Sequence, residues 1–195
     1  MPRNILIVDG HPDPDRGRFL HALAAAYKEG AVAAGHNVRE IRLGRLEFPL
    51  LATNADFQKG IVPPVIANGQ ESMQWADHWV ILYPLWLGSM PALLKGFFEQ
   101  TLRPGFAFAA GAKGGFPKKL LAGRSARIVV TMGMPAFFYR WYFRAHSLKS
   151  LERNILAFVG IKPVNASIIG SVDGMTQQER ERWLETMQKL GRQAR

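Results

Sequence analysis

A chain of 195 residues that is 48% hydrophobic and 21% charged is long enough to bury a full core as one domain. It contains no cysteine, which excludes disulfides, thiolate metal ligands and a cysteine nucleophile, so redox chemistry here would require a cofactor. The net charge of +10 suits anionic cofactors or an anionic membrane surface, but the basic residues are dispersed without a nucleic-acid-binding motif, so we expect no nucleic-acid partner. Without a signal-peptide pattern or an apolar run of membrane-spanning length, we expect a cytoplasmic protein.

Segments with the patterns of strands and helices alternate along the chain. We predict strands over residues 3–8, 37–43, 79–82, 126–131 and 164–169, and helices over residues 19–34, 71–76, 91–102, 148–159 and 176–190. Five strands alternating with helices predict an α/β fold, a doubly wound parallel sheet with helices on both faces, in a single domain over residues 1–195. Residues 44–70 and the glycine-rich, basic residues 103–124 lie outside this pattern, as is typical of functional or interface loops.

The loop that follows the third strand is the most informative segment. Pro84 ends a continuously apolar run, Gly88 and Ser89 predict a turn and an N-cap hydroxyl, and Pro91 suits a first helical turn. In an open α/β sheet, ligands bind at this edge. The side chains and amides of the loop, Pro84-Leu85-Trp86-Leu87-Gly88, are suited to a flat, hydrogen-bonding ring. From the residues alone, an ordinary turn with Trp86 in the core is an equal alternative.

The first strand is followed by a second candidate loop, residues 10–19 with the sequence GHPDPDRGRF. A glycine-containing turn that opens a helix directs unpaired amides at a ligand, and the helix dipole favours an anion such as a phosphate. The candidate phosphate-binding residues are His11, Arg16, Gly17, Arg18 and Phe19. The loop is not a dinucleotide-binding GxGxxG motif. Arg16 and Arg18 are equally explained as solvated charges at a helix start.

The string PLWLGSMPALLKGFFEQTLRPGFAF at residues 84–108 resembles the signature of the flavodoxin-like NAD(P)H quinone reductases, the family of DT-diaphorase and the bacterial potassium-efflux ancillary oxidoreductases. The resemblance implies that residues 84–88 contact a flavin ring. It also implies that the loop after the first strand, with its matching His11, holds the flavin phosphate. Gly17 and Arg18 depart from this family, which has Ser or Asn at that place.

The same resemblance extends beyond the fourth strand. It implies that Thr131, Met132 and Gly133 lie against the other side of the flavin, although Met134 replaces a second glycine of the family's pattern. Further along, Tyr139 and His146 resemble the family's substrate-pocket residues, which flank the flavin and donate to a quinone oxygen. Buried aromatic residues of a dimer interface are the alternative for this region.

The family implies a flavin-dependent NAD(P)H oxidoreductase that reduces quinones or similar electrophiles by ping-pong hydride transfer. We expect no metal, because the sequence places no third carboxylate beside Asp13 and Asp15. We expect FMN, with FAD as the alternative, and NADPH or NADH as co-substrate. We also expect a homodimer built on residues 44–70 and 137–143. A flavin-binding regulatory subunit with a membrane potassium-efflux partner is the second reading. A flavodoxin-type electron carrier is the third, and the charge of +10 argues against it.

Overall fold

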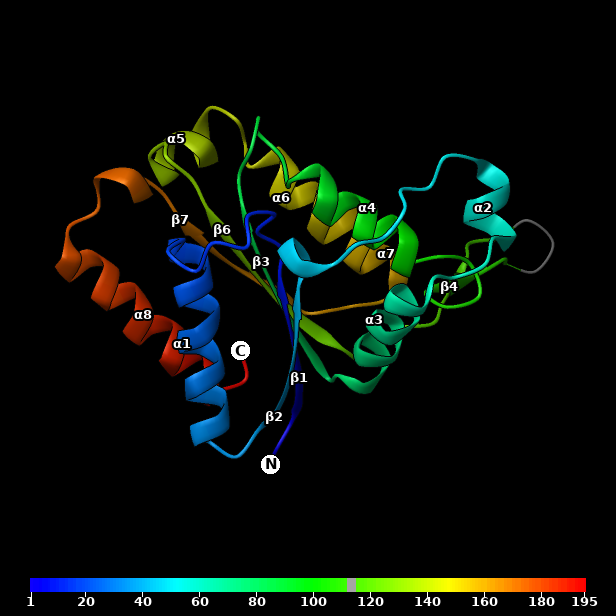
Figure 1. The fold of residues 1–195 in the computed structure, drawn as a ribbon, viewed down its shortest axis with the longest axis horizontal. Coiled ribbons are helices and arrows are strands. Elements are labelled where there is room, and N and C mark those ends of the chain that lie inside the picture. The colour runs from blue at the N-terminus through cyan, green and yellow to red at the C-terminus, as the bar shows by residue number, and fades with distance from the viewer. Residues whose placement is uncertain (112–114) are drawn as a thin grey trace.

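Five parallel strands form the centre of the molecule (Figure 1), whose computed structural model describes residues 1–111 and 115–195. In order of pairing, the strands are β2 (Asn37–Arg42), β1 (Asn4–Asp9), β3 (His78–Pro84), β6 (Ser125–Thr131) and β7 (Val164–Ile169). The strand order reverses between β1 and β3, and the loops that leave these two strands diverge there. In such sheets this switch point at the carboxyl edge forms the ligand crevice. The predicted doubly wound parallel sheet is confirmed.

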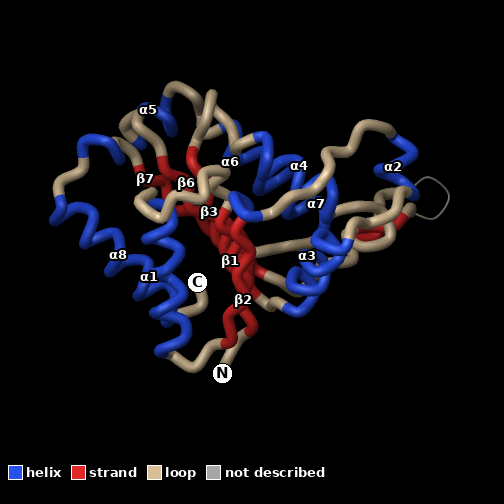
Figure 2. The backbone as a smooth tube through the Cα atoms, in the orientation of Figure 1, coloured by secondary structure: helices blue, strands red, loops and turns tan. Residues whose placement is uncertain are grey.

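Helices cover both faces of the sheet (Figure 2). One face carries α1 (Phe19–Ala33) and α8 (Gln177–Arg192). The other carries α3 (Pro64–Trp75), α4 (Ala92–Thr101) and a continuous helical segment made of α6 (His146–Ser150), the π-helix η3 (Leu151–Leu156) and α7 (Ala157–Val159). Because side chains alternate along a strand, β3 sends Trp79 and Tyr83 into the second layer and Val80 into the first. Every residue of β3 is buried, as its apolar run predicts.

The remaining elements are short. They are η1 (Leu43–Arg45), α2 (Asn54–Lys59), the antiparallel pair β4 (Phe108–Ala109) and β5 (Lys118–Lys119), α5 (Ala136–Trp141) and η4 (Val172–Gly174). The pair β4 and β5 lies within the predicted insertion at residues 103–124, of which residues 112–114 fall outside the described part of the chain. Within the residues described, no helix has the length and apolar character needed to cross a bilayer.

Two predicted helix starts were wrong. The helix expected at residues 71–76 begins seven residues earlier, at Pro64, and buries Ile66, Gly69 and Met73. Gly69 weakens the helical pattern but allows a close approach, since a Cβ there would lie 3.3 Å from Cζ of Phe97. The helix predicted at residues 148–159 starts at His146, and α5 was missed because its aromatic residues carry no clear helical periodicity.

Candidate functional site

A pocket of about 400 Å³ lies at the carboxyl edge of the sheet, where the loops that leave four strands meet. Its volume falls within the range of about 300–1,000 Å³ that is typical of small-molecule sites. Three of these loops, after β1, β3 and β6, were predicted from the sequence, and the loop after β7 was not. The lining residues are His11, Gly17, Arg18, Phe19, Leu20, Pro84, Leu85, Trp86, Thr131, Met132, Gly133, Val172, Asp173 and Arg180.

His11 is held in one tautomer in the first loop. Its Nδ1 accepts a hydrogen bond from the amide of Asp13 at 3.1 Å, so the ring proton of the neutral form is on Nε2. Burial lowers the pKa of His11, and the charge of His21 lowers it further. The ring of Trp86 meets His11 edge-on, with the two ring centroids 6.0 Å apart. His11 therefore contributes an uncharged wall next to the β3 loop.

The amino end of α1 opens into the pocket. The helix begins at Phe19, and the side chain of the N-cap residue Arg18 makes no capping hydrogen bond. Phe19 and Leu20 both line the pocket, and their amides have no partner within the helix, whereas the amide of His21 donates to the carbonyl of Arg18 at 3.0 Å. A helix end of this kind favours an anion, and phosphate binding at this place stays a prediction.

The arginine that is available to a ligand at this helix end is neither of the two predicted from the sequence. Arg18 forms an ion pair with Asp13 at 2.6 Å, and the Asp15 amide together with Arg18 keeps the pKa of Asp13 below its ordinary value. Arg18 is thus engaged by a carboxylate, and Arg16 does not line this pocket. Arg180 of α8 reaches it instead and donates to the carbonyl of Val172 at 2.6 Å.

The loop after β3 folds back on itself and does not cap the next helix. Trp86 and Ser89 exchange two backbone hydrogen bonds of 2.9 Å, while Leu87 and Gly88 adopt positive φ angles of 47° and 77°. Ser89 is therefore not the predicted N-cap, a position that Pro91 occupies. Leu87 is fully exposed at the tip of this turn, and neither it nor Gly88 lines the pocket.

The loops after β6 and β7 are bonded to one another. The amide of Val172 donates to the carbonyl of Met132 at 3.1 Å, and Met132 and Thr131 are buried. A Cβ at Gly133 would lie 2.8 Å from a carboxylate oxygen of Asp173. Glycine at this position therefore leaves room for the Asp173 side chain at the pocket wall. Sequence analysis missed Asp173 and Arg180, although the carboxyl end of the fifth strand marks the same sheet edge.

Tyr139 and His146 do not line the pocket. Tyr139 is 1% exposed, its hydroxyl lies 2.8 Å from Oγ of Ser147, and it accepts a hydrogen bond from the amide of Leu148. His146 is exposed at the start of α6. In this conformation, neither residue is positioned to contact a substrate bound in the pocket. Tyr139 instead connects α5 to α6 through its hydrogen bonds.

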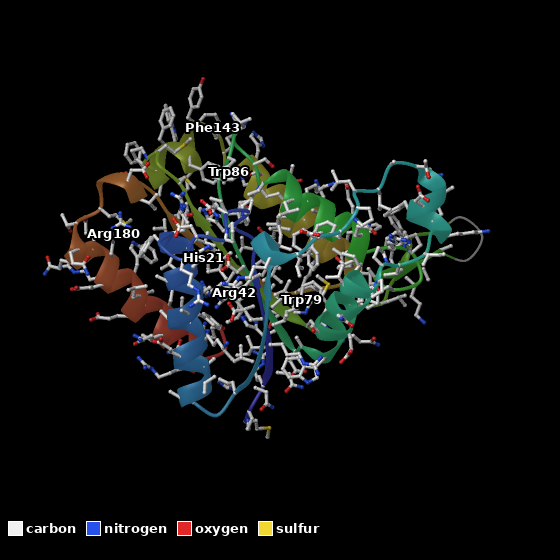
Figure 3. All side chains as sticks on the ribbon, in the orientation of Figure 1. His21, Arg42, Trp79, Trp86, Phe143 and Arg180 are labelled. Carbon is white, nitrogen blue, oxygen red and sulfur yellow. The ribbon has the colours of Figure 1, made fainter. Side chains whose placement is uncertain are left out.

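The neighbours of Tyr139 form an exposed aromatic patch, defined as Phe137, Phe138, Trp141, Tyr142 and Phe143. Phe137 is 72% exposed and Trp141 is 79% exposed. Figure 3 shows Trp86 and Phe143 at the same end of the sheet, with Arg180 on the side of α8. Exposed apolar surfaces of this kind commonly mark interaction sites.

Comparison with known proteins finds oxidoreductases that are similar to this chain in sequence or in fold. An uncharacterized NAD(P)H oxidoreductase of Haemophilus influenzae is 26% identical over 186 residues, which cover 93% of this chain and 91% of that protein. NAD(P)H dehydrogenase (quinone) 1 of Rattus norvegicus is also 26% identical, over 96% of this chain and 76% of that protein. An FMN-dependent NADH-azoreductase from Bacillus anthracis, solved in complex with FMN, has the same fold, with a TM-score of 0.79 and 17% identity over 99% of this chain and 100% of that chain.

A shorter similarity concerns the potassium-efflux interpretation. The ancillary protein KefG of the glutathione-regulated potassium-efflux system of Cronobacter sakazakii is 42% identical over 66 residues, which cover 33% of each protein. The family described as having a flavodoxin-like fold, in contrast, matches residues 3–190. The chain therefore belongs to this flavodoxin-like family.

Proposed function

We propose that this protein is a flavin-dependent NAD(P)H oxidoreductase that reduces quinones or similar electrophiles. The observation that carries the proposal is the pocket at the carboxyl edge, which places the open end of α1 and Arg180 next to the β3 and β6 loops. The names of the Haemophilus and rat relatives support the same activity.

The pocket residues fit a flavin mononucleotide. The amides at the start of α1 and the guanidinium of Arg180 are suited to a phosphate, because charge-assisted hydrogen bonds are the strong ones. Pro84, Leu85 and Trp86 on one loop and Thr131, Met132 and Gly133 on another would hold the ring system. We choose FMN over FAD because the volume of about 400 Å³ suits a mononucleotide, and because the Bacillus neighbour is FMN-dependent.

When bound, the flavin would accept a hydride from NAD(P)H and pass two electrons to the second substrate. The chain's own residues would position the ring, exclude water and supply polar contacts at its edge. Since one pocket would serve both substrates, we propose that they bind in turn. The neutral His11 adds no charge to the wall of this pocket near neutral pH.

We also propose a homodimer in which the aromatic patch is buried against a second copy. Leu50 and Ile61, in the segment of residues 44–70, are further exposed apolar side chains available to such an interface. A regulatory role in potassium efflux is not proposed, because the similarity to KefG covers only 33% of this chain.

Reconstitution and steady-state kinetics test the proposed function. We expect stoichiometric binding of FMN with visible absorption, followed by NAD(P)H-dependent reduction of a small quinone with parallel-line kinetics. Binding of neither FMN nor FAD would refute the flavin assignment. Intersecting lines would instead refute alternate use of one pocket.

A further inference from the structure

A second pocket, of about 270 Å³, lies between α1 and the end of β2. It shares no lining residue with the proposed flavin pocket. Figure 3 shows two of its side chains, His21 and Arg42, next to one another between these elements. The complete lining is Pro14, Arg16, His21, Ala22, Ala25, Arg42, Gly44 and Arg45. We call this the basic pocket.

The walls of the basic pocket are fixed by the core. Gly44 packs directly on the first loop, since a Cβ there would lie 2.7 Å from the carbonyl oxygen of Pro12. Only glycine permits this approach of η1 to the loop without a shift of the backbone. The ring of His21 is held through Nδ1 by the carboxylate of Asp9, which is 1% exposed, and lies 3.0 Å through Nε2 from the carbonyl of Asp13. The pocket is therefore a built feature of the fold.

The charge of the lining is positive. Three arginines contribute, and no carboxylate belongs to the lining. Arg42 donates from Nε to Glu40 at 2.6 Å, but Glu40 also accepts from Lys28 at 3.2 Å, so one carboxylate faces two cations. Within the described residues, the side chains of Arg16 and Arg45 have no hydrogen-bond or ion-pair partner among protein groups. Two guanidinium groups are thus free to bind a ligand.

We propose that the basic pocket binds a phosphate group, as inorganic phosphate or as a phosphomonoester. Guanidinium groups make bidentate hydrogen bonds to phosphate oxygens, and several arginines in one concave site favour a dianion over a carboxylate. A volume of about 270 Å³ suits a phosphate with an attached sugar and is too small for a whole dinucleotide. Two sources share this chemistry, namely the 2′-phosphate of NADPH and a separate phosphomonoester.

Calorimetric titration in phosphate-free, low-salt buffer tests the proposal, with inorganic phosphate and 2′-AMP as probes. We expect saturable binding to the wild-type protein with and without FMN. Arg45→Ala should weaken it about ten- to a hundredfold, the usual effect of losing a charged hydrogen bond. Arg45 is exposed and unbonded, so its loss should not affect folding, and an unchanged melting temperature verifies this. Arg182→Ala, which removes an exposed charge from α8, is the matched control and should bind as the wild type does.

Three outcomes would overturn the proposal. They are no saturable binding to the wild type, an equal loss in Arg45→Ala and Arg182→Ala, and binding that disappears when FMN is bound. The last result would mean that the basic pocket is part of the flavin phosphate site. None of these measurements needs turnover, so failure here is distinguishable from failure of the proposed redox function.

Kinetics then identify the source of the phosphate. A KM for NADPH that rises about tenfold or more in Arg45→Ala, with an unchanged KM for NADH, assigns the pocket to the 2′-phosphate of NADPH. Unchanged KM values for both, together with weakened phosphate binding, assign it to a separate phosphomonoester. Both results support phosphate binding by the basic pocket.

Discussion

The guanidinium of Arg180 lies over the ring of Phe19, with its central carbon 5.0 Å from the ring centroid. The two residues belong to α8 and α1, at opposite ends of the chain, and both line the proposed flavin pocket. A cation over an aromatic face is attracted by the ring quadrupole, so Phe19 helps to hold Arg180 beside the start of α1. The proposed phosphate site therefore uses groups from both helices.

Arg180→Ala should weaken FMN binding about ten- to a hundredfold while leaving riboflavin binding unchanged. The reason is that Arg180 is proposed to contact the phosphate, which riboflavin lacks, and a hydrogen bond to a charged group contributes about 1.5–3 kcal/mol. Fluorescence titration of the apoprotein with each flavin measures both affinities. Arg182→Ala is the control, and equal weakening for FMN and riboflavin would show that Arg180 supports the pocket without binding phosphate.

Gly133→Ala should weaken flavin binding without unfolding the protein. The new methyl group would displace the carboxylate of Asp173, which lies 2.8 Å from its position, and a side-chain end moves more easily than backbone. Gly174→Ala is the matched control, because a Cβ at Gly174 meets nothing within 4 Å. The double variant Gly133→Ala, Asp173→Ala should recover part of the lost affinity, and its failure to do so would contradict a steric cause.

Tyr139→Phe should lower the free energy of unfolding by about 1–3 kcal/mol, because it leaves the buried Ser147 hydroxyl and the amide of Leu148 without their partner. Urea denaturation measures this change, and Ser147→Ala should reproduce part of it. Stopped-flow measurement of flavin reoxidation separates the two interpretations of this residue. A slowed oxidative half-reaction in a stable variant would support the substrate contact of Tyr139 that was predicted from the sequence.

The protein should lose stability as the pH falls from about 6.5 toward 5. Burial, together with the charges of Arg3 and Arg127, lowers the pKa of His78 to about 3. Below its ordinary pKa of about 6.5, the unfolded state binds a proton that the folded state refuses, which costs up to about 1.4 kcal/mol per pH unit. His11 shifts in the same direction.

Urea denaturation at several pH values tests this expectation. His78→Asn retains a side chain able to bond the hydroxyl of Ser125, which lies 2.8 Å from His78 Nδ1. This variant should show a shallower dependence of the unfolding free energy on pH. An identical slope in the variant and the wild type would assign the pH dependence to other groups.

Light scattering should give the mass of a dimer at micromolar concentration. Trp141→Glu introduces a charge into the aromatic patch, where Trp141 is 79% exposed, and should shift the equilibrium toward the monomer. Val32→Glu places the same charge at an exposed position of α1 and should leave the mass unchanged. A wild-type protein of monomer mass would refute the dimer.

Local patterns in the sequence were sufficient to predict the five strands and three of the four loops of the pocket. The apolar run that ends at Pro84 identifies a central strand, because only a strand covered on both faces is apolar at every position. Gly10 likewise marks the loop after the first strand, and the structure supplies the reason for a glycine there, because a Cβ would lie 2.7 Å from the carbonyl oxygen of Leu82. Parallel strands then place their following loops at one edge, so the general location of the pocket follows from these patterns. The family was indicated separately, by the resemblance of residues 84–108 to its signature.

Only the tertiary structure decided which side chains meet at that edge. Hydrophobic periodicity determines which face of a helix is buried, but it contains no information about contacts between distant loops. We expected Arg18 to contact a phosphate, but it pairs with Asp13. Arg180, which lies 162 residues later in the chain, also lines the pocket. The hydroxyl of Tyr139 lies against Ser147 because α5 and α6 pack together there. Such choices depend on long-range packing and charge pairing, which become defined only when the chain is folded.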